Sequence, residues 1–144
     1  MRFHFGRKNV IKKFSSTDEY LKYYGFKHVN DYYTKTVYAG YDHGDVDFHY
    51  HTFPLYNAIK QYDVDLNLVE LLLKDGADPN FTTQKSLGPV LHTILMNSWN
   101  ENTLPVIKLL LKYGADINIR DDDYQTPLHQ VAFRWNNHYS EEII

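Results

Sequence analysis

TLPVIKLLLKYGADINIRDDDYQTPLH, at residues 103–129, is the stretch of sequence that decides the fold. Pro105 is tolerated in the first turn of a helix, where its missing N–H costs no hydrogen bond. Apolar residues then recur at helical spacing, and Gly114 supplies the left-handed residue that commonly ends a helix. Thr126-Pro127 has the form of a second helix start. The stretch therefore predicts a helix, a tight turn, a short polar loop and another helix.

This pattern occurs more than once in the chain. Residues 71–80 read LLLKDGADPN, and residues 109–118 read LLLKYGADIN, 38 positions later. Helix starts that contain proline recur at Pro54, Pro89 and Pro127. A self-similar unit of this length indicates a solenoid, in which each helix pair buries its apolar face against its neighbours.

The repeats resemble the ankyrin family. This resemblance implies an all-α ankyrin-repeat solenoid, built of stacked helix-turn-helix units joined by short β-turn fingers. By position, Thr126 would bond within its own repeat, and His92 and His129 would tie successive repeats together. The positions that match the family's structural motif are Gly76, Asp78, Asn80, His92, Gly114, Asp116, Asn118, Thr126, Pro127, Leu128 and His129.

Four segments follow from this resemblance. Residues 1–51 would form a helical amino-terminal cap or a degenerate repeat. Repeat 1 would span residues 52–82, repeat 2 residues 83–120, and an incomplete repeat 3 residues 121–144. The last segment ends where a second helix would begin, so we expect the front portion of a longer array. Apolar surface of the LLL helix at 109–111 would then stay partly exposed, which favours self-association.

The amino-terminal region has weaker signals. Ser16 and Glu19 form a capping box, which predicts a helix over residues 17–24 closed by Gly25. We expect Asn30 to cap a second helix over residues 31–38, although the Thr, Val and Tyr content of that stretch also suits a strand. GDVDF at residues 44–48 reads as a decayed GADxN turn. Together these signals predict a degenerate helix pair.

Composition excludes several classes of function. The 144 residues are 43% hydrophobic and 23% charged, carry a formal charge of −3 and include no cysteine. The chain therefore suits one globular domain, has no basic field for nucleic acid or acidic lipid, and cannot form disulfides or thiolate zinc sites. No apolar run has the length of a signal peptide or a membrane helix, so we expect a cytoplasmic protein.

Catalysis and cofactors find little support in the sequence. No glycine-rich phosphate loop and no nucleophile motif is present, so we expect no catalytic residue and no cofactor. A weaker alternative is a zinc site in the cluster Asp42, His43, Asp45, Asp47, His49 and His51. His49 and His51 would face the same side of an extended segment. Because the spacing matches no zinc pattern, our prediction is no metal.

Long links between helices, irregular repeat lengths and a Tyr- and Asn-rich sequence look like the ankyrin proteins of poxviruses. That resemblance implies a non-catalytic module that binds host proteins in the host-cell cytoplasm, for host range or immune evasion. Many of that group carry an F-box-like segment that recruits a ubiquitin ligase. The alternative is therefore a remnant of such an adaptor, with little activity of its own.

Candidate partner-binding residues lie on the fingers and on the links between helices. Exposed aromatic residues and arginines on a rigid frame are favoured anchors in protein interfaces. For the two tryptophans, a buried structural role is the alternative. The candidates are Phe81, Lys85, Arg120, Asp122 and Tyr124 on the fingers, with Trp99 and Trp135 in or near the links.

Overall fold

A computed structural model describes residues 12–41, 44–61, 63–82, 88–96 and 101–139, with residues 33–41, 44–51 and 135–139 described by their backbone alone. Within these ranges the chain forms a helix, a β-hairpin and then five further helices. The elements are α1 (Thr17–Tyr24), β1 (Tyr33–Tyr41), β2 (Gly44–Thr52), α2 (Pro54–Ile59), α3 (Leu66–Lys74), α4 (Val90–Met96), α5 (Thr103–Lys112) and α6 (Pro127–Tyr139).

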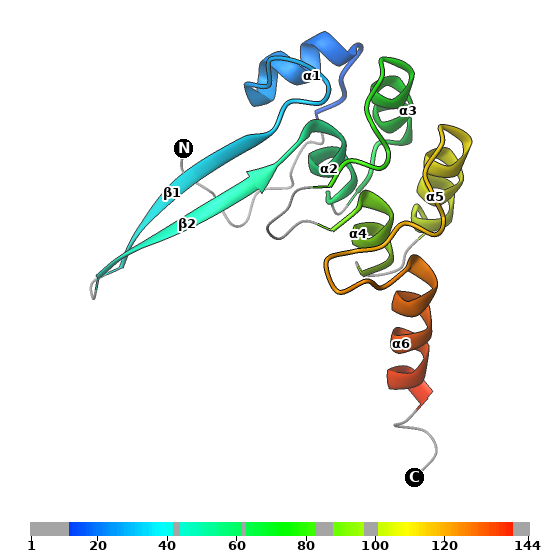
Figure 1. Ribbon diagram of the computed structural model, residues 1–144. Helices are drawn as coiled ribbons and strands as arrows, with labels where there is room; N and C mark the ends of the chain where they lie inside the picture. The colour runs from blue at the N-terminus through cyan, green and yellow to red at the C-terminus, as the bar shows by residue number, and fades with distance from the viewer. Residues whose placement is uncertain (1–11, 42–43, 62, 83–87, 97–100, 140–144) are drawn as a thin grey trace.

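The helices form two parallel rows. The first row contains α2, α4 and α6, and the second row contains α1, α3 and α5, with each helix packed on the next in its row (Figure 1). Within a repeat, α2 packs on α3 and α4 packs on α5. This arrangement confirms the all-α solenoid predicted for the repeats. No helix in the described ranges has the length and apolar character needed to cross a membrane.

The second-row helices α3 and α5 both end just before a glycine, as the sequence predicts. Asp65 caps α3, and its carboxylate accepts hydrogen bonds from the N–H groups of Asn67 and Leu68 at 3.0 and 3.3 Å. Gly76 and Gly114 follow α3 and α5 with φ of 94° and 95°. Because this region is costly for a residue with a Cβ, glycine is the natural choice at both positions.

One continuous core lies between the two rows. It contains buried apolar residues of both repeats and continues to Tyr20 and Leu21 on α1 and to Phe26 just after it. Burial of these side chains is the main favourable term in the stability of a solenoid. The core residues with no measurable exposure are Val69, Leu72, Val90, Val106 and Leu110.

The amino-terminal helix agrees with the sequence only in part. As predicted, α1 ends at Gly25, which has φ of 78°, and the Ser16 hydroxyl accepts a hydrogen bond from the Glu19 N–H at 3.2 Å. The reciprocal half of the capping box differs from the prediction. The Glu19 carboxylate accepts hydrogen bonds from the N–H and the hydroxyl of Ser15 at 3.0 and 2.9 Å.

The predicted second helix of this region is wrong. Residues 33–41 and 44–52 form an antiparallel hairpin in which Val37 lies opposite Phe48. Residues 44–48 are therefore part of a strand and not a decayed turn. The β-branched and aromatic residues of both segments favour a pleated strand over a helix. In Figure 1 the hairpin extends away from the helices, and it occupies the place of a finger between α1 and α2.

Asn30 has a different role from the helix cap that we expected. Its side chain donates a hydrogen bond to the Gly76 carbonyl and accepts one from the Asp78 N–H, both at 2.8 Å. Asn80 makes the same two contacts one layer further on, to the Gly114 carbonyl at 3.0 Å and the Asp116 N–H at 2.7 Å. The α1 helix and the turn after it are thus arranged like the second half of a repeat.

Candidate functional site

Residues 119–126, which we call finger 3, join α5 to α6 through a loop that is closed on itself. The Asp121 carboxylate accepts hydrogen bonds from the N–H groups of Asp123 and Gln125 at 3.0 and 2.9 Å. The Asp121 N–H donates to the Gln125 carbonyl at 2.9 Å, and the Tyr124 N–H donates to the Asp121 carbonyl at 3.0 Å. An Asp side chain that satisfies its own turn in this way stabilises one loop conformation.

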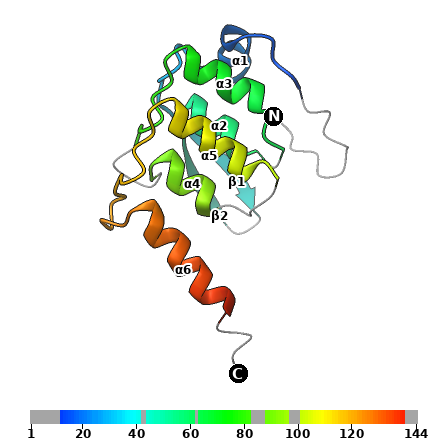
Figure 2. The same cartoon turned by 90° about the vertical axis from the view of Figure 1, so that its right-hand side faces the viewer.

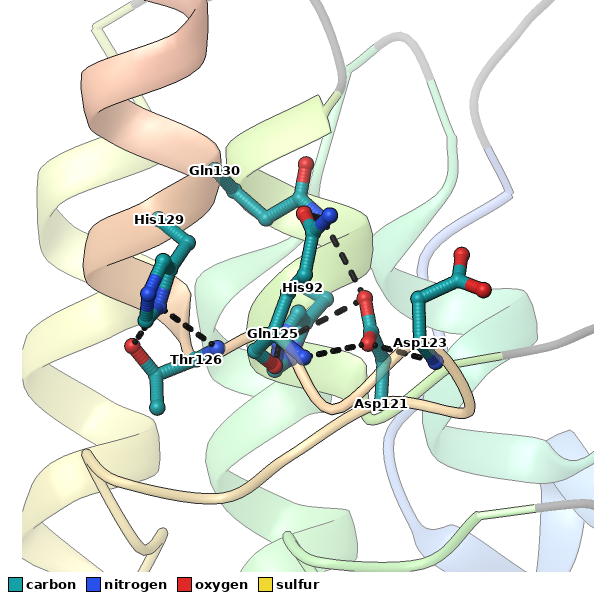
Figure 3. A network of polar contacts seen from close by, with 7 residues as sticks. All are labelled: His92, Asp121, Asp123, Gln125, Thr126, His129 and Gln130. Carbon is teal, nitrogen blue, oxygen red and sulfur yellow. Dashed lines mark hydrogen bonds and ion pairs between the residues drawn. The ribbon is translucent and has the colours of Figure 1, made fainter.

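Two helices hold finger 3 in place. On α4, the buried His92 brings Nε2 to 2.8 Å from the Gln125 carbonyl oxygen and to 4.0 Å from Asp121 Oδ2. On α6, Gln130 Nε2 donates to Asp121 Oδ2 at 3.2 Å. Figure 3 shows these contacts converging on the Asp121 carboxylate. Because the contacts come from two successive repeats, the finger is positioned by the stack and not only by its own sequence.

The tip of finger 3 presents an aromatic ring to solvent. Tyr124 is 77% exposed. Its φ of 61° is the only positive value among the non-glycine residues that the structure describes. This backbone region is unfavourable for a bulky side chain, and strained residues of this kind concentrate at functional positions. Arg120 and Asp122 belong to the same loop and are also exposed.

The predicted binding residues separate into two groups. Arg120, Asp122 and Tyr124 lie together on finger 3. Phe81, in contrast, is partly buried and packs on Phe53 with ring centroids 4.6 Å apart, so its ring belongs to the core. Three further candidates cannot be placed: Lys85 and Trp99 lie outside the described residues, and the side chain of Trp135 on α6 is also outside them.

The motif residues at the two GADxN turns have equivalent contacts. Asp78 and Asp116 each accept a hydrogen bond from the N–H two residues later, at 2.8 Å in both turns. Asn80 bonds to the next layer, as described above. No described residue makes a hydrogen bond to the Asn118 side chain, which occupies the same position in the last turn. Asn118 therefore presents an amide that its equivalents use to bind a following repeat.

In the TPLH motif at residues 126–129, the threonine and the histidine bond to each other, whereas the leucine is exposed. Thr126 Oγ1 lies 2.8 Å from His129 Nδ1, and the Thr126 N–H donates to the same nitrogen at 3.1 Å. Leu128 is 74% exposed, whereas Leu55 and Leu91, at the equivalent positions of the earlier repeats, are 1% and 3% exposed. Leu128 therefore occupies a structural motif position without being part of the core.

Sequence reasoning missed Gln130, which joins α6 to finger 3, and Arg134, which joins α6 to α4 of the preceding repeat. Arg134 Nη1 donates to the carbonyls of Leu95 and Met96 at 2.8 and 2.9 Å, and thereby satisfies the carboxyl-terminal end of α4. A cation is favourable at that end of a helix. An Arg eight residues into a helix has no local signal for this role, because its partners belong to another repeat.

Metal chemistry has no support among the described side chains, which include no group of three or more residues able to hold an ion. The cluster from Asp42 to His51 lies outside that set, because positions 42 and 43 are not described and the strand residues are described by backbone alone. Finger 3 carries an exposed aromatic ring, a cation and carboxylates.

Comparison with known proteins agrees with this geometry. The family model for ankyrin repeats in three copies matches residues 55–143. The ankyrin repeat protein FPV031 of fowlpox virus (strain NVSL) is 35% identical over 74 residues, which is 49% of this chain and 20% of that protein. FPV222 of the same virus is 36% identical over 78 residues, which is 54% of this chain and 10% of that protein.

The chain thus spans 20% or less of the length of these relatives. No solved structure matches it. The two fowlpox proteins confirm the resemblance to poxvirus ankyrin proteins. Since the ankyrin family model covers more than half of the chain, this protein belongs to the ankyrin-repeat family, whose repeats are protein–protein interaction modules.

Proposed function

We propose that this chain binds a protein partner through finger 3, with Tyr124 as the central anchor and with no catalytic step. The observation that carries the proposal is an exposed aromatic ring on a loop that is closed by its own hydrogen bonds and held by His92 and Gln130. A rigid Tyr contributes contact area at low entropic cost. Arg120 beside it is the other residue type that is enriched among interface anchors.

The partner that we propose is a host protein, met in the host-cell cytoplasm. Support comes from the two fowlpox relatives, whose names describe them as ankyrin repeat proteins of a virus. A host-range or immune-evasion role would follow if the captured protein belongs to an antiviral response. The alternative is an adaptor role within a longer ankyrin and F-box-like protein, where the repeats would select the protein that a ubiquitin ligase modifies.

The experiment is affinity capture from host-cell lysate with the purified chain, followed by measurement of the affinity for the captured protein. Tyr124→Gly removes the ring and relieves the positive φ, so it should preserve or raise stability while weakening binding at least about tenfold. Tyr23→Ala, an exposed tyrosine on α1, is the matched control and should bind normally. Equal affinity of Tyr124→Gly and the native chain for the captured protein would contradict the proposal.

The same experiment distinguishes an independent binding module from the adaptor role. A partner captured through Tyr124 by the purified chain supports an independent binding module. If capture requires a longer protein that contains these repeats, the adaptor role is favoured. Thermal unfolding of each variant, followed by circular dichroism, checks that loss of binding is not loss of structure.

A further inference from the structure

The β1–β2 hairpin has two faces of opposite character. Residues directly opposite each other in antiparallel strands share a face, and neighbours along a strand alternate. The pairs Val37↔Phe48 and Ala39↔Val46 lie on one face, with Lys35↔Tyr50 beside them. The other face has Thr34, Thr36, Tyr38 and Gly40 on β1, opposite His51, His49, Asp47 and Asp45 on β2.

Among the described residues, nothing supports this hairpin as a larger sheet would be supported. In the described part of the chain the sheet contains β1 and β2 only, so the outer edge of each strand carries unpaired backbone groups. Figures 1 and 2 show no helix lying along either face. A two-stranded sheet of this kind is marginal in water, and an open edge is a template for another strand.

The sequence of β2 is complementary to itself in the antiparallel direction. It reads GDVDFHYHT, with two aspartates before Phe48 and two histidines after it at matching distances. When two copies pair about Phe48, Asp47 lies opposite His49 and Asp45 lies opposite His51. We propose that β2 pairs with β2 of a second copy of this chain, with Phe48 at the two-fold axis, to form a four-stranded antiparallel sheet.

Other registers are less favourable. Pairing about Asp47 places two aspartates directly opposite each other, and pairing about His49 does the same with two histidines, which repel when protonated. Pairing through β1 brings no opposite charges together, because Lys35 is its only charged residue. The register about Phe48 is the one in which every charged position meets its opposite. A symmetric contact of this kind closes as a dimer.

The apolar face supports the same register. In that pairing Phe48 lies opposite Phe48, and Val46 lies opposite Tyr50, so aromatic and β-branched residues meet across the new interface. Such cross-strand pairs are favourable in antiparallel sheets. The two central strands therefore contribute apolar residues to one face of the four-stranded sheet and alternating Asp and His to the other. Dimerisation would stabilise each hairpin, because a two-stranded sheet is only marginally stable by itself.

Disulfide trapping tests the register directly, because the chain contains no cysteine. Antiparallel partners lie about 4.5–5.5 Å apart between Cα atoms, within the range that a disulfide spans. F48C should therefore form a covalent dimer at least about tenfold faster than T36C, whose copies would lie roughly 16 Å apart, across three strand spacings and offset by two residues along the strands. Crosslinking of F48C no faster than T36C would overturn the proposal.

A rival interface is the exposed apolar layer of α5 and α6. Ala132 is exposed on α6, so A132C reports on that interface. If A132C crosslinks rapidly and F48C does not, the chain associates through its last repeat and the proposed pairing is wrong. Sedimentation of the native chain over a range of concentrations should show a monomer–dimer equilibrium, and a strict monomer would also overturn the proposal.

Charge exchange provides a second, independent test. D45K/D47K and H49D/H51D should each be monomeric, because each places like charges opposite one another. A mixture of the two variants should form a heterodimer, in which Lys meets Asp and His meets Asp. D63K/D75K changes the net charge as much as D45K/D47K at exposed positions away from the hairpin and should dimerise normally. A mixture that stays monomeric contradicts the register.

The pH dependence of dimerisation distinguishes ion pairs from a bridging metal. An aspartate opposite each histidine favours the protonated imidazole, so affinity should rise as pH falls from 7.5 to 5.5, through the ordinary histidine range near about 6.5. On β1, the groups opposite are Thr34, Thr36 and Tyr38, and none of these is charged below about pH 9. Dissociation by a chelator, or tighter binding at higher pH, would instead indicate a metal and overturn the ion-pair assignment.

Discussion

The third leucine of the LLLK motif is buried in repeat 1 and exposed in repeat 2. Leu73 on α3 is 5% exposed, whereas Leu111 at the same position of α5 is 38% exposed. In the turns that follow, Pro79 of repeat 1 is partly buried, whereas Ile117 at the same position of repeat 2 is exposed. Because the motif is the same in both repeats, the difference comes from the next layer. Whether a leucine of this motif is buried therefore depends on whether another helix packs against it.

The two ends of the stack also differ from each other. At the amino-terminal end, α1 covers α3, and Tyr20 and Phe26 extend the core. At the other end, α5 presents Leu104 and Leu111, and α6 presents Leu128 and Phe133. A solenoid needs a polar or capped outer layer to be soluble on its own. The described structure provides that cap at one end.

The comparison is tested most strongly by truncating equivalent leucines. Leu91→Ala should lower the free energy of unfolding by about 2–4 kcal/mol, because it leaves a cavity in the core. Leu128→Ala should lower it by less than about 0.5 kcal/mol, as is usual for an exposed position. Urea denaturation followed by circular dichroism measures both. Equal losses would mean that Leu128 is covered in solution.

The attachment of the amino-terminal cap gives the next largest effect. The buried Tyr20 hydroxyl donates to the Pro54 carbonyl at 3.0 Å and accepts from Asn57 Nδ2 at 2.9 Å. Tyr20→Phe leaves the Asn57 amide without this partner and should cost about 1–2 kcal/mol. Tyr124→Phe, at an exposed position, should have no measurable cost and is the control.

The same residue predicts a dependence on pH. Burial raises the pKa of the Tyr20 phenol above its ordinary value, so the folded state favours the neutral form. The stabilising contribution is therefore complete below about pH 10, the unfolded value, and is lost as pH rises above it. Denaturation between pH 9 and 11 should show a steeper loss of stability in the native chain than in Tyr20→Phe. Parallel curves would contradict burial of this hydroxyl.

Substitution of the turn asparagines tests whether the hydrogen bonds between layers differ at the two turns. Asn80→Ala removes both contacts to the Gly114 and Asp116 backbone, and should cost about 1 kcal/mol. Asn118→Ala should be close to neutral, because its amide binds no described residue. Thermal unfolding of the two variants gives the difference. A cost at Asn118 as large as that at Asn80 would reveal a partner for the last turn.

The smallest effect is expected at the charged surface between the repeats. Glu70 Oε1 lies 3.1 Å from Lys112 Nζ of the next repeat and 3.9 Å from Lys74 Nζ of its own helix. Hydrogen bonds from Lys112 and Tyr113 hold the pKa of Glu70 below its ordinary value. Its contribution is therefore present above the unfolded pKa of about 4.3 and is lost as pH falls below it.

Glu70→Gln should accordingly lower the unfolding midpoint slightly at neutral pH and low salt. The loss should shrink at high salt, since exposed ion pairs are screened. Glu101→Gln, an exposed glutamate outside this pair, is the control. A loss that does not change with salt would assign the effect to packing.

Local sequence was sufficient for most of the helices. The spacing of apolar residues and the glycines after α3 and α5 identify both helices, because these signals act within a few residues. Residues 31–38, which include most of the first strand, were predicted as a helix with a strand as the alternative, and this ambiguity has a physical reason. Tyr33, Val37 and Tyr41 are four residues apart, which fits one face of a helix as well as one face of a strand. Only the pairing of β1 with β2 separates the two.

The candidate site was predictable in part. Arg120, Asp122 and Tyr124 are neighbours in the sequence, so their gathering on one loop needs no tertiary information. The contacts of finger 3 with His92 and Gln130 do need it, because they join α4, the loop and α6. The same holds for Phe81, whose packing on Phe53 removes it from the exposed candidates.

By itself, the sequence determined the repeat: which residues end the second-row helices and turn the chain, and that successive units stack. These properties depend on backbone preferences and spacing, which are local. The tertiary structure alone decided which copy of a motif is buried, which asparagine is paired and where the hairpin extends. Exposure depends on the element that packs against a residue, and identical leucines differ here because, within the described ranges, a second-row helix follows α3 but none follows α5.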